Sequence, residues 1–261
     1  SSSRDYKMKN WALILGASSG IGAACAKKLA ESGMNIYGIY LRKPQSVIDE
    51  LESYIKSQNV EVKFHKMNAM NDEKRQEVIN NLKDLGTVKT FVHSIAFGTL
   101  KPMLSKNDEP SLDSKNIEMT INVMGSSLVY WTQNLYQANL LQKGAQIFSM
   151  TSSGGHRQWP SYGAVSMAKS ALESASRQLA IELASEGIAV NAIQAGVTDT
   201  PALRKIPGNE KMIDYANNHN PSGRLTMPED IADYIALLSK SNNSWMTGNI
   251  LRIDGGEDII G

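Results

Sequence analysis

A tyrosine and a lysine in the segment PSYGAVSMAK, Tyr162 and Lys169, are suited to acid catalysis and are seven residues apart. On an α-helix, positions i and i+7 lie within about 20° of one face, so both side chains can point into one cleft. A phenol can donate to an oxygen that becomes negative, and a nearby ammonium favours the acidic behaviour of the phenol. Pro160 just upstream places Tyr162 on the first turn of the helix or just before it.

A glycine-rich segment near the start of the chain, GASSGIG, could bind phosphate groups. It contains Gly16, Gly20 and Gly22 between a buried strand pattern and a helix pattern, and Ser18 and Ser19 add two hydroxyl donors. Glycines let the backbone approach a diphosphate closely, and a helix N-terminus supplies amide donors. The alternative is a glycine turn needed only for packing the helix on the sheet. Its position at the first strand-to-helix turn favours dinucleotide binding.

The end of the second strand pattern, YLRKPQ, bears on which dinucleotide binds. Arg42 and Lys43 stand there, and no acid follows until Asp49. NAD sites usually place an acid at this point for the ribose hydroxyls, whereas basic groups suit the 2′-phosphate of NADP. The segment therefore favours NADPH, and the alternative is a solvated basic pair at the start of a helix.

Composition excludes several other classes of function. The 261 residues are 41% hydrophobic and 20% charged, with a net charge of +1. The balance indicates a globular core and neither a nucleic-acid surface nor a membrane patch. A single cysteine, Cys25, four scattered histidines and no long apolar run predict no disulfide, no metal site and no membrane span. We expect a soluble cytoplasmic protein with a flexible segment over residues 1–10.

Strand patterns alternate with helix patterns along the whole chain. The strands are expected at 11–16, 34–41, 60–67, 88–96, 145–152, 188–196 and 249–256, and helices at 21–33, 44–58, 71–86, 113–142, 161–186 and 228–239. Such alternation requires crossover connections and predicts an α/β fold, a doubly wound parallel sheet with helices on both faces. By analogy with such folds, the strand order is 3-2-1-4-5-6-7 in a single Rossmann-type domain over 11–261. The polar stretch 201–224 predicts a mobile lid, lined by Ala202, Leu203, Ile206 and Met212.

These motifs together resemble the short-chain dehydrogenase/reductase family over nearly the whole chain. Besides GASSGIG, INVMG places Asn122 at the family's helix asparagine, and IFSMTSS places Ser152 at its serine. AGVTDTPAL resembles the segment after strand six, with Ala195 in place of the usual proline and Thr200 at the threonine.

Two departures from the majority pattern resemble the enoyl-acyl-carrier-protein reductase branch. The tyrosine-to-lysine spacing is seven residues instead of four, and HSIAFG replaces the usual motif after strand four. The best-known members of that branch have a rearranged glycine loop, whereas this chain keeps GASSGIG. The combination, with Ser152 ten residues before Tyr162, resembles the NADPH-dependent type III branch.

The resemblance implies a set of site residues. Tyr162, Lys169, Ser152 and Asn122 would be catalytic, with Asn122 anchoring a water or the strand-four backbone, or else only bending its helix. Cofactor contacts would come from Gly16, Ser18, Ser19, Gly20, Ile21, Gly22, Arg42, Lys43, Asn68, Ala69, Ser94, Ile95, Ala96, Lys169, Gly196, Thr198 and Thr200. Thr200 has a simple helix N-cap as its alternative role.

The displaced tyrosine suits one reaction better than another. With a spacing of seven, the two Cα atoms lie about 10 Å apart along the helix axis, against about 6 Å for a spacing of four. In ketone reduction, hydride lands about 1.2 Å from the oxygen that needs a proton, whereas in enoyl thioester reduction the two sites are about 3 Å or more apart. Because an acid must meet charge where it develops, the shifted phenol favours the enoyl thioester.

The sequence thus predicts an NADPH-dependent enoyl-acyl-carrier-protein reductase of fatty-acid biosynthesis. Its partner would be an acyl carrier protein, with Arg204 and Lys205 as docking residues or ordinary surface charge. Family analogy gives a homotetramer. Two alternatives stay open: a carbonyl reductase of 3-oxoacyl thioester or hydroxysteroid type, and a cofactor-binding regulatory protein without turnover.

Overall fold

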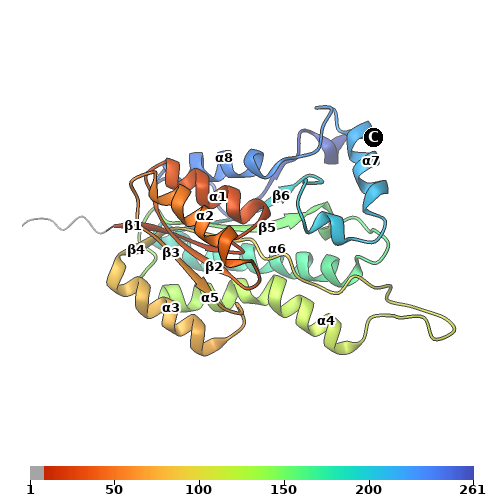
Figure 1. The fold of residues 1–261 in the computed structure, drawn as a ribbon, viewed down its shortest axis with the longest axis horizontal. Helices are drawn as coiled ribbons and strands as arrows, with labels where there is room; N and C mark the ends of the chain where they lie inside the picture. Colours follow the sequence, from red (N-terminus) through yellow and green to blue (C-terminus); the bar gives the residue numbers. More distant parts are fainter. Residues whose placement is uncertain (1–8) are drawn as a thin grey trace, which may run out of the picture.

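The computed structural model describes residues 9–261, and seven parallel strands form its central sheet (Figure 1). The strands are β1 Asn10–Leu15, β2 Asn35–Tyr40, β3 Val62–Lys66, β4 Thr87–His93, β5 Gln146–Ser152, β6 Ala189–Ala195 and β7 Ile250–Ile253. Their order is β3-β2-β1-β4-β5-β6-β7 and every pair is parallel. The predicted fold class and strand order are confirmed.

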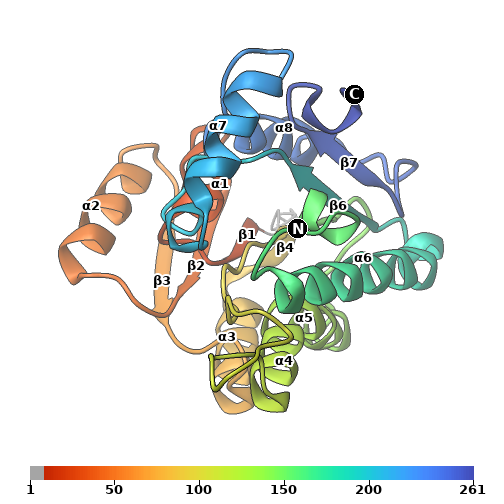
Figure 2. The same cartoon turned by 90° about the vertical axis from the view of Figure 1, so that its right-hand side faces the viewer.

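Helices cover both faces of this sheet, as the turned view shows (Figure 2). One face carries α1 Gly20–Glu31, α2 Gln45–Lys56 and α8 Pro228–Ser239. The other carries α3 Asp72–Leu85, α5 Ser127–Gln137 and α6 Gly163–Leu183, with α4 Ser114–Ile121 beside α6. The remaining helix, α7 Asn209–His219, lies near the ends of β5 and β6, where its Tyr215 lines a cavity with Ser153 and Ala195 (Figure 1).

Each face of the sheet has its own hydrophobic core. The first packs Cys25 and Leu29 of α1 and Ile235 of α8 against the sheet. The second packs Leu82 of α3 and Trp131 of α5. Because the strands are covered on both sides, β1, β2, β5 and β6 are almost continuously buried, as expected for a parallel sheet.

Local sequence signals explain where several helices begin and end. The side chain of Asn71 caps α3 by accepting from the amide of Lys74, and Gly86 follows its last residue. A side chain at Gly86 would meet the backbone of Lys9, so only glycine fits. Helix α8 begins at Pro228 and spans exactly the residues predicted for it.

The structure differs from the predicted elements in three places. The segment expected as one helix over 113–142 is α4 and α5 joined by a π-helical turn at Asn122–Ser126. The helix expected from 161 begins at Gly163, so Tyr162 stands just before it. The stretch 201–224, for which no helix was predicted and which was expected to form a lid, contains α7, and α7 buries Met212 and Ala216.

Two other predictions concern what the described residues lack. Within 9–261, no helix is long and apolar enough to cross a membrane, and no cluster of three or more ligand-type side chains could hold a metal ion. Of the segment 1–10 predicted to be flexible, residues 1–8 lie outside the described part, and Asn10 opens β1.

Candidate active site

The glycine loop lies between β1 and α1, and its glycines are required by close backbone approaches. A Cβ at Gly16 would lie 1.8 Å from the carbonyl oxygen of Ser94, and one at Gly22 would lie 1.9 Å from that of Gly16. Ser19 is the N-cap of α1, yet its side chain makes no capping hydrogen bond. The first amides of α1 thus have no side-chain acceptor, which leaves this N-terminus able to bind an anion.

The ends of β4 and β6 come close to the same loop. Ser94 donates its amide to the carbonyl of Leu15 and borders Gly16. Thr200 lies beside Gly20, where an added Cβ would be 3.4 Å from its methyl group. The carboxyl edge of an open parallel sheet is the general place for a ligand in doubly wound folds, so the structure brings these predicted cofactor residues together there.

The basic pair follows β2 at that edge. Arg42 is exposed and Lys43 is half-buried, and neither forms an ion pair with an acid among the described residues. Two cations without a protein counter-charge can bind a phosphate group.

The phenol of Tyr162 lies beside the hydroxyl of Ser152, with 3.4 Å between the two oxygens. Ser152 ends β5 and Tyr162 immediately precedes α6, so the loop between them brings the two hydroxyls together. The tyrosine ring packs on the backbone of Gly154, where a Cβ would lie 2.3 Å from a ring carbon. Gly154 is therefore a site residue that the sequence analysis missed.

Burial raises the pKa of Tyr162, although the hydrogen bond with Ser152 lowers it in part. The phenol therefore stays protonated at neutral pH and can donate a hydrogen bond to a substrate oxygen. From the sequence, the ammonium of Lys169 was expected to promote the acidity of this phenol. In the structure burial dominates, and the ammonium is bound elsewhere.

Lys169 points from α6 toward the sheet and is 8% exposed. Its Nζ donates to the carbonyl of Met150 in β5 over 2.6 Å. Burial lowers the pKa of Lys169 to about 8, and the charge of Glu173 opposes that shift. The ammonium is therefore present at neutral pH and lost on mild alkalinisation.

A buried imidazole lies in the same region. His93 at the end of β4 contacts the hydroxyl of Ser127 through Nε2, over 2.7 Å, and Ser127 donates to the carbonyl of Val123. Burial first, and the charge of Lys169 second, lower the pKa of His93 to about 3. The neutral His93 thus ties β4 to the π-helical turn.

Asn122 opens this π-helical turn and its side chain is exposed. Within the described residues the side-chain amide of Asn122 makes no hydrogen bond to protein, so it is not bonded to Tyr162 or Lys169. Asn122 thus lies where the helix changes from α to π geometry, and single π turns of this kind are common at functional sites.

The hydroxyl of Thr200 accepts from the backbone amide of Leu203 over 3.2 Å, while Ala202 is the N-cap residue of the short 3-10 helix Leu203–Lys205. The hydroxyl of Thr198 donates to the carbonyl of Gly196. Beyond the end of β3, the side-chain oxygen of Asn68 accepts a hydrogen bond from the backbone amide of Met70. The other predicted cofactor residues follow the ends of strands or lie in the glycine loop: Ser18, Ile21, Ala69, Ile95 and Ala96.

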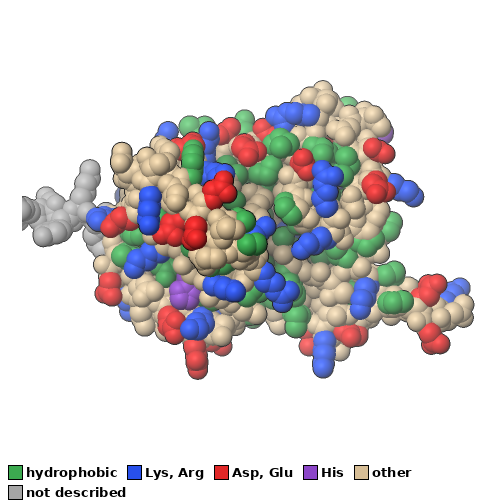
Figure 3. Space-filling model, in the orientation of Figure 1, with side chains coloured by type: hydrophobic (Ala, Val, Ile, Leu, Met, Phe, Trp, Pro, Cys, Tyr) green, Lys and Arg blue, Asp and Glu red, His purple; other side chains and the backbone are tan. Residues whose placement is uncertain are grey.

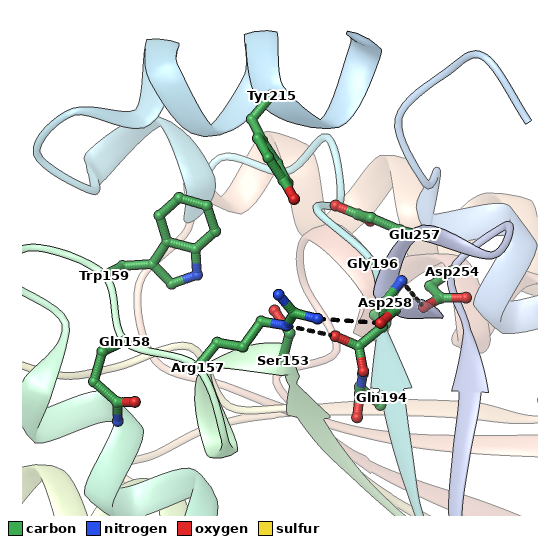
Figure 4. A pocket seen from close by; sticks show the side chains of 11 residues that line it. Ser153, Arg157, Gln158, Trp159, Gln194, Gly196, Tyr215, Asp254, Glu257 and Asp258 are labelled. Carbon is green, nitrogen blue, oxygen red and sulfur yellow. Dashed lines mark hydrogen bonds and ion pairs between the residues drawn. The ribbon is translucent and has the colours of Figure 1, made fainter. Parts of the chain in front are cut away.

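Two cavities adjoin the loop that carries Tyr162. The first, of ≈ 300 Å³, opens at the ends of β5, β6 and β7, and its lining includes Trp159, Tyr215 and Glu257 (Figure 4). The second, of ≈ 260 Å³, lies between α6 and the segment 101–103 and includes Met103 and Met167. Trp159 lines both, and its ring meets that of Tyr215 edge-on with centroids 6.1 Å apart.

Comparison with known proteins agrees with this architecture. The family model described as "Enoyl-(Acyl carrier protein) reductase" matches residues 16–257. The enoyl-[acyl-carrier-protein] reductase [NADH] FabI of Aquifex aeolicus is 31% identical over 195 residues, 73% of this chain and 71% of that protein. The 3-oxoacyl-[acyl-carrier-protein] reductase FabG of Thermotoga maritima is 27% identical over 94% of this chain and 96% of its own.

Solved structures show the same fold at low identity. A 3-oxoacyl-[acyl-carrier protein] reductase from Brucella melitensis in complex with NAD has a TM-score of 0.83 and 21% identity, covering 97% of this chain and 98% of that one. The family match over most of the chain, with the strand order and the glycine loop, settles the assignment. The chain belongs to the short-chain dehydrogenase/reductase family and is an oxidoreductase whose fold binds a nicotinamide cofactor.

Proposed function

We propose that this oxidoreductase reduces the trans-2 double bond of enoyl-acyl-carrier-protein thioesters with NADPH. The observation that carries the proposal is the position of Tyr162, directly before α6 and 3.4 Å from Ser152, with Lys169 seven residues further on. With the tyrosine outside the helix, its phenol lies further toward the helix start than a tyrosine four residues before the lysine.

That displacement supports the enoyl substrate on geometric grounds. The β-carbon that accepts hydride is about 3 Å or more from the thioester oxygen, whereas in a ketone the two atoms are about 1.2 Å apart. A donor moved away from the lysine can meet the more distant oxygen, where the negative charge of the enolate develops.

The side chains of the site have complementary roles in this proposal. Tyr162, kept protonated by burial, donates a hydrogen bond to the thioester oxygen. Ser152 orients the phenol or contacts the same oxygen. Lys169 holds the ribose hydroxyls of the cofactor with the ammonium protons not donated to Met150. After hydride addition, a proton reaches the α-carbon and completes the reduction.

The glycine loop and the basic pair fit a phosphorylated dinucleotide. The amides at the start of α1 can bind the diphosphate, and Arg42 and Lys43 can bind a 2′-phosphate. When bound, the reduced nicotinamide supplies the hydride. The FabI relative of Aquifex aeolicus is named for NADH, so the preference of this chain for NADPH over NADH is a point that the variant below tests.

A substrate comparison tests the proposed reaction. The purified chain is given crotonyl and acetoacetyl thioesters separately, and NADPH oxidation is followed at 340 nm under otherwise equal conditions. We expect turnover of the crotonyl thioester. Turnover of the acetoacetyl compound alone would replace the proposal by a carbonyl reductase, the candidate that the FabG relatives favour.

A variant tests the cofactor. Arg42→Gln removes one cation, and we expect a KM for NADPH that rises about tenfold or more, while the KM for NADH stays within twofold. An equal effect on both cofactors would remove Arg42 from 2′-phosphate recognition.

The protein partner in this proposal is an acyl carrier protein, and the reaction takes place in the cytoplasm. Lys205 is exposed, and Arg204 pairs with Asp199 over 3.0 Å at an exposed site near α7. Both cations could face an acidic carrier protein.

A further inference from the structure

The loop between β5 and α6, residues 153–161, connects the two hydroxyl residues of the site and is held on one side by α6. Ser166 donates to the carbonyl of Gly154, and Ser170 donates to that of Gly155 over 3.1 Å. These contacts attach the first half of the loop to the helix that begins after Tyr162.

The opposite side of the loop is held by a single carboxylate near the end of the chain. Asp258 accepts from Nε of Arg157 over 2.8 Å and contacts Nε2 of His156 over 3.0 Å. A second nitrogen of Arg157 donates to the carbonyl of Asp258 over 3.1 Å. Figure 4 shows Arg157 reaching across the cavity to this residue.

Asp258 is itself held in position by the strands and by its own turn. The side-chain amide of Gln194 in β6 donates to the carboxylate of Asp258 over 3.0 Å. The backbone amide of Asp258 in turn donates to the carboxylate of Asp254 over 3.0 Å. Its side chain is only 10% exposed, against 48% for Arg157. Burial alone raises the pKa of Asp258, but Gln194, His156 and Arg157 together lower it, so the carboxylate remains charged.

The residue directly before the tyrosine lies in a turn that begins two residues after Arg157, where the amide of Tyr162 donates to the carbonyl of Trp159 over 3.2 Å. Ser161 has φ +63°, in the left-handed region that a non-glycine residue rarely adopts. A conformation of this kind persists when the surrounding structure enforces it. It sets the direction in which the chain enters Tyr162 and α6.

We propose that Asp258 is a positioning residue for the site: by holding Arg157 and His156 it keeps Ser161 left-handed and the phenol of Tyr162 beside Ser152. The residues of the last turn, far from the loop in sequence, thereby determine where the acid of the reaction lies. The inference rests on the proposed function only in taking Ser152 and Tyr162 as the reacting hydroxyls.

The first test measures the loop itself. The substitution Asp258→Asn keeps the size of the side chain and removes the negative charge of its carboxylate. We expect amide hydrogen exchange over 153–162 to become at least about tenfold faster, while exchange in β1 and α1 stays unchanged. Glu61→Gln removes an exposed ion pair of similar length, Lys9 to Glu61 at 2.9 Å, and serves as the matched control with unchanged exchange in both regions.

The second test measures catalysis at a temperature at which the variants are fully folded. We expect kcat of Asp258→Asn to fall about tenfold to a hundredfold, because small displacements of a reacting group have effects of that size. The dissociation constant for NADPH should stay within twofold. A stability role alone would leave kcat of the folded variant unchanged.

A rescue distinguishes positioning from general damage. Glycine adopts φ > 0 without strain, so Ser161→Gly in the Asp258→Asn background should recover part of kcat, at least about threefold. If Asp258→Asn does not fold, Arg157→Gln removes the exposed partner instead and should give the same faster exchange and lower kcat.

Wild-type exchange over 153–162 together with wild-type kcat in the folded variants would overturn the inference. The proposed function can fail separately. If only the acetoacetyl thioester is turned over, the assigned reaction changes, but hydrogen exchange over 153–162 and kcat for the acetoacetyl thioester still test the role of Asp258.

Discussion

At the scale of single residues, the proposed chemistry depends on a phenol that burial keeps protonated. Tyr162 has its pKa raised by burial, and its only hydroxyl partner among the described residues is Ser152. Gly154 lies under the ring and admits no side chain. The phenol is therefore available as a donor over the whole neutral range.

Replacement of this phenol gives the first prediction. In Tyr162→Phe the ring is kept and the donor is lost, so kcat for the crotonyl thioester should fall at least about 10²-fold. NADPH affinity, measured by the change in its fluorescence, should change by less than twofold. Tyr136→Phe, on the exposed side of α5, is the matched control with unchanged kcat. A small effect on kcat would exclude Tyr162 as the donor.

Lys169 gives a prediction on pH. Its pKa is lowered to about 8, so the ammonium is present below that pH and lost above it. If the ammonium holds the cofactor sugar, the dissociation constant for NADPH should rise as pH increases through about 8. In Lys169→Arg the charge persists to higher pH, and the rise near pH 8 should disappear. A flat profile for the wild type would contradict the assigned role.

The same shift has a consequence for stability. Between about pH 8 and the ordinary lysine pKa of 10.5, the unfolded chain binds a proton at Lys169 that the folded chain has lost. The free energy of unfolding attributable to this residue therefore rises with pH over that window.

At the scale of elements, β4 is joined to the π-helical turn through His93 and Ser127. The imidazole has its pKa lowered from 6.5 to about 3, chiefly by burial. As pH falls from 6.5 toward 3, the unfolded chain binds a proton that folded His93 does not, so this residue makes folding less favourable in acid.

A substitution at His93 tests this linkage. His93→Gln keeps a donor for Ser127 but removes the titration, so its Tm should fall less steeply than that of the wild type between pH 6.5 and 4. His65→Gln, in β3, is a matched control that should keep the wild-type slope. Parallel slopes for His93→Gln and the wild type would show that His93 does not drive the acid sensitivity.

The loop between β5 and α6 gives a prediction on substrate size. Trp159 and its neighbour Gln158 line both the cavity at the ends of β5–β7 and the cavity bordered by Met103 and Met167. Trp159→Ala should join the two spaces and raise the kcat/KM of a dodecenoyl thioester relative to crotonyl by about tenfold. Trp159→Phe keeps a ring at this position and should stay close to the wild-type ratio. An unchanged ratio in Trp159→Ala would place the acyl chain elsewhere.

At the scale of the whole molecule, charges are mixed and apolar side chains remain exposed. Figure 3 shows acidic and basic side chains interspersed over one face. Trp245, Leu237 and Ile259 are exposed near α8 and β7, and Ile181 is exposed on α6. Exposed apolar groups of this size can form contacts between copies of a chain.

On family analogy we propose that the 28.6 kDa chain forms a homotetramer, and these exposed side chains are candidates for its contacts. Light scattering after gel filtration measures the assembly, and Leu237→Ser with Trp245→Ser should reduce the mass to that of a smaller species. Leu104→Ser, on the exposed segment 101–110, is a matched control that should leave it unchanged. A monomeric wild type would contradict the expectation.

The sequence was sufficient to predict the sheet, because buried strands and amphipathic helices alternate with clear periodicity. The glycine loop was predicted at its observed position between β1 and α1, and the family resemblance implied that Ser152 and Tyr162 share a site. The sequence could not reveal α7, since that helix buries few apolar side chains and is otherwise polar. The π-helical turn at Asn122 has no periodic signal either.

The residues that the sequence analysis missed act through contacts distant along the chain. Asp258 meets Arg157 a hundred and one positions earlier, and Trp159 meets Tyr215 across the cavity. Local patterns carry no record of such pairs. His93 belongs to a quoted motif, but its role depends on Ser127, which only the packing of β4 on α5 reveals.

The contact between Lys169 and the Met150 carbonyl has a further meaning for cofactor entry. An ammonium has three protons, and one is already engaged with β5, so two remain for the two hydroxyls of a sugar. In the proposed site, Lys169 is already fixed to β5 before the dinucleotide binds, and cofactor binding would add two hydrogen bonds to its ammonium without breaking the first. Arrival of the cofactor should consequently require little rearrangement of α6.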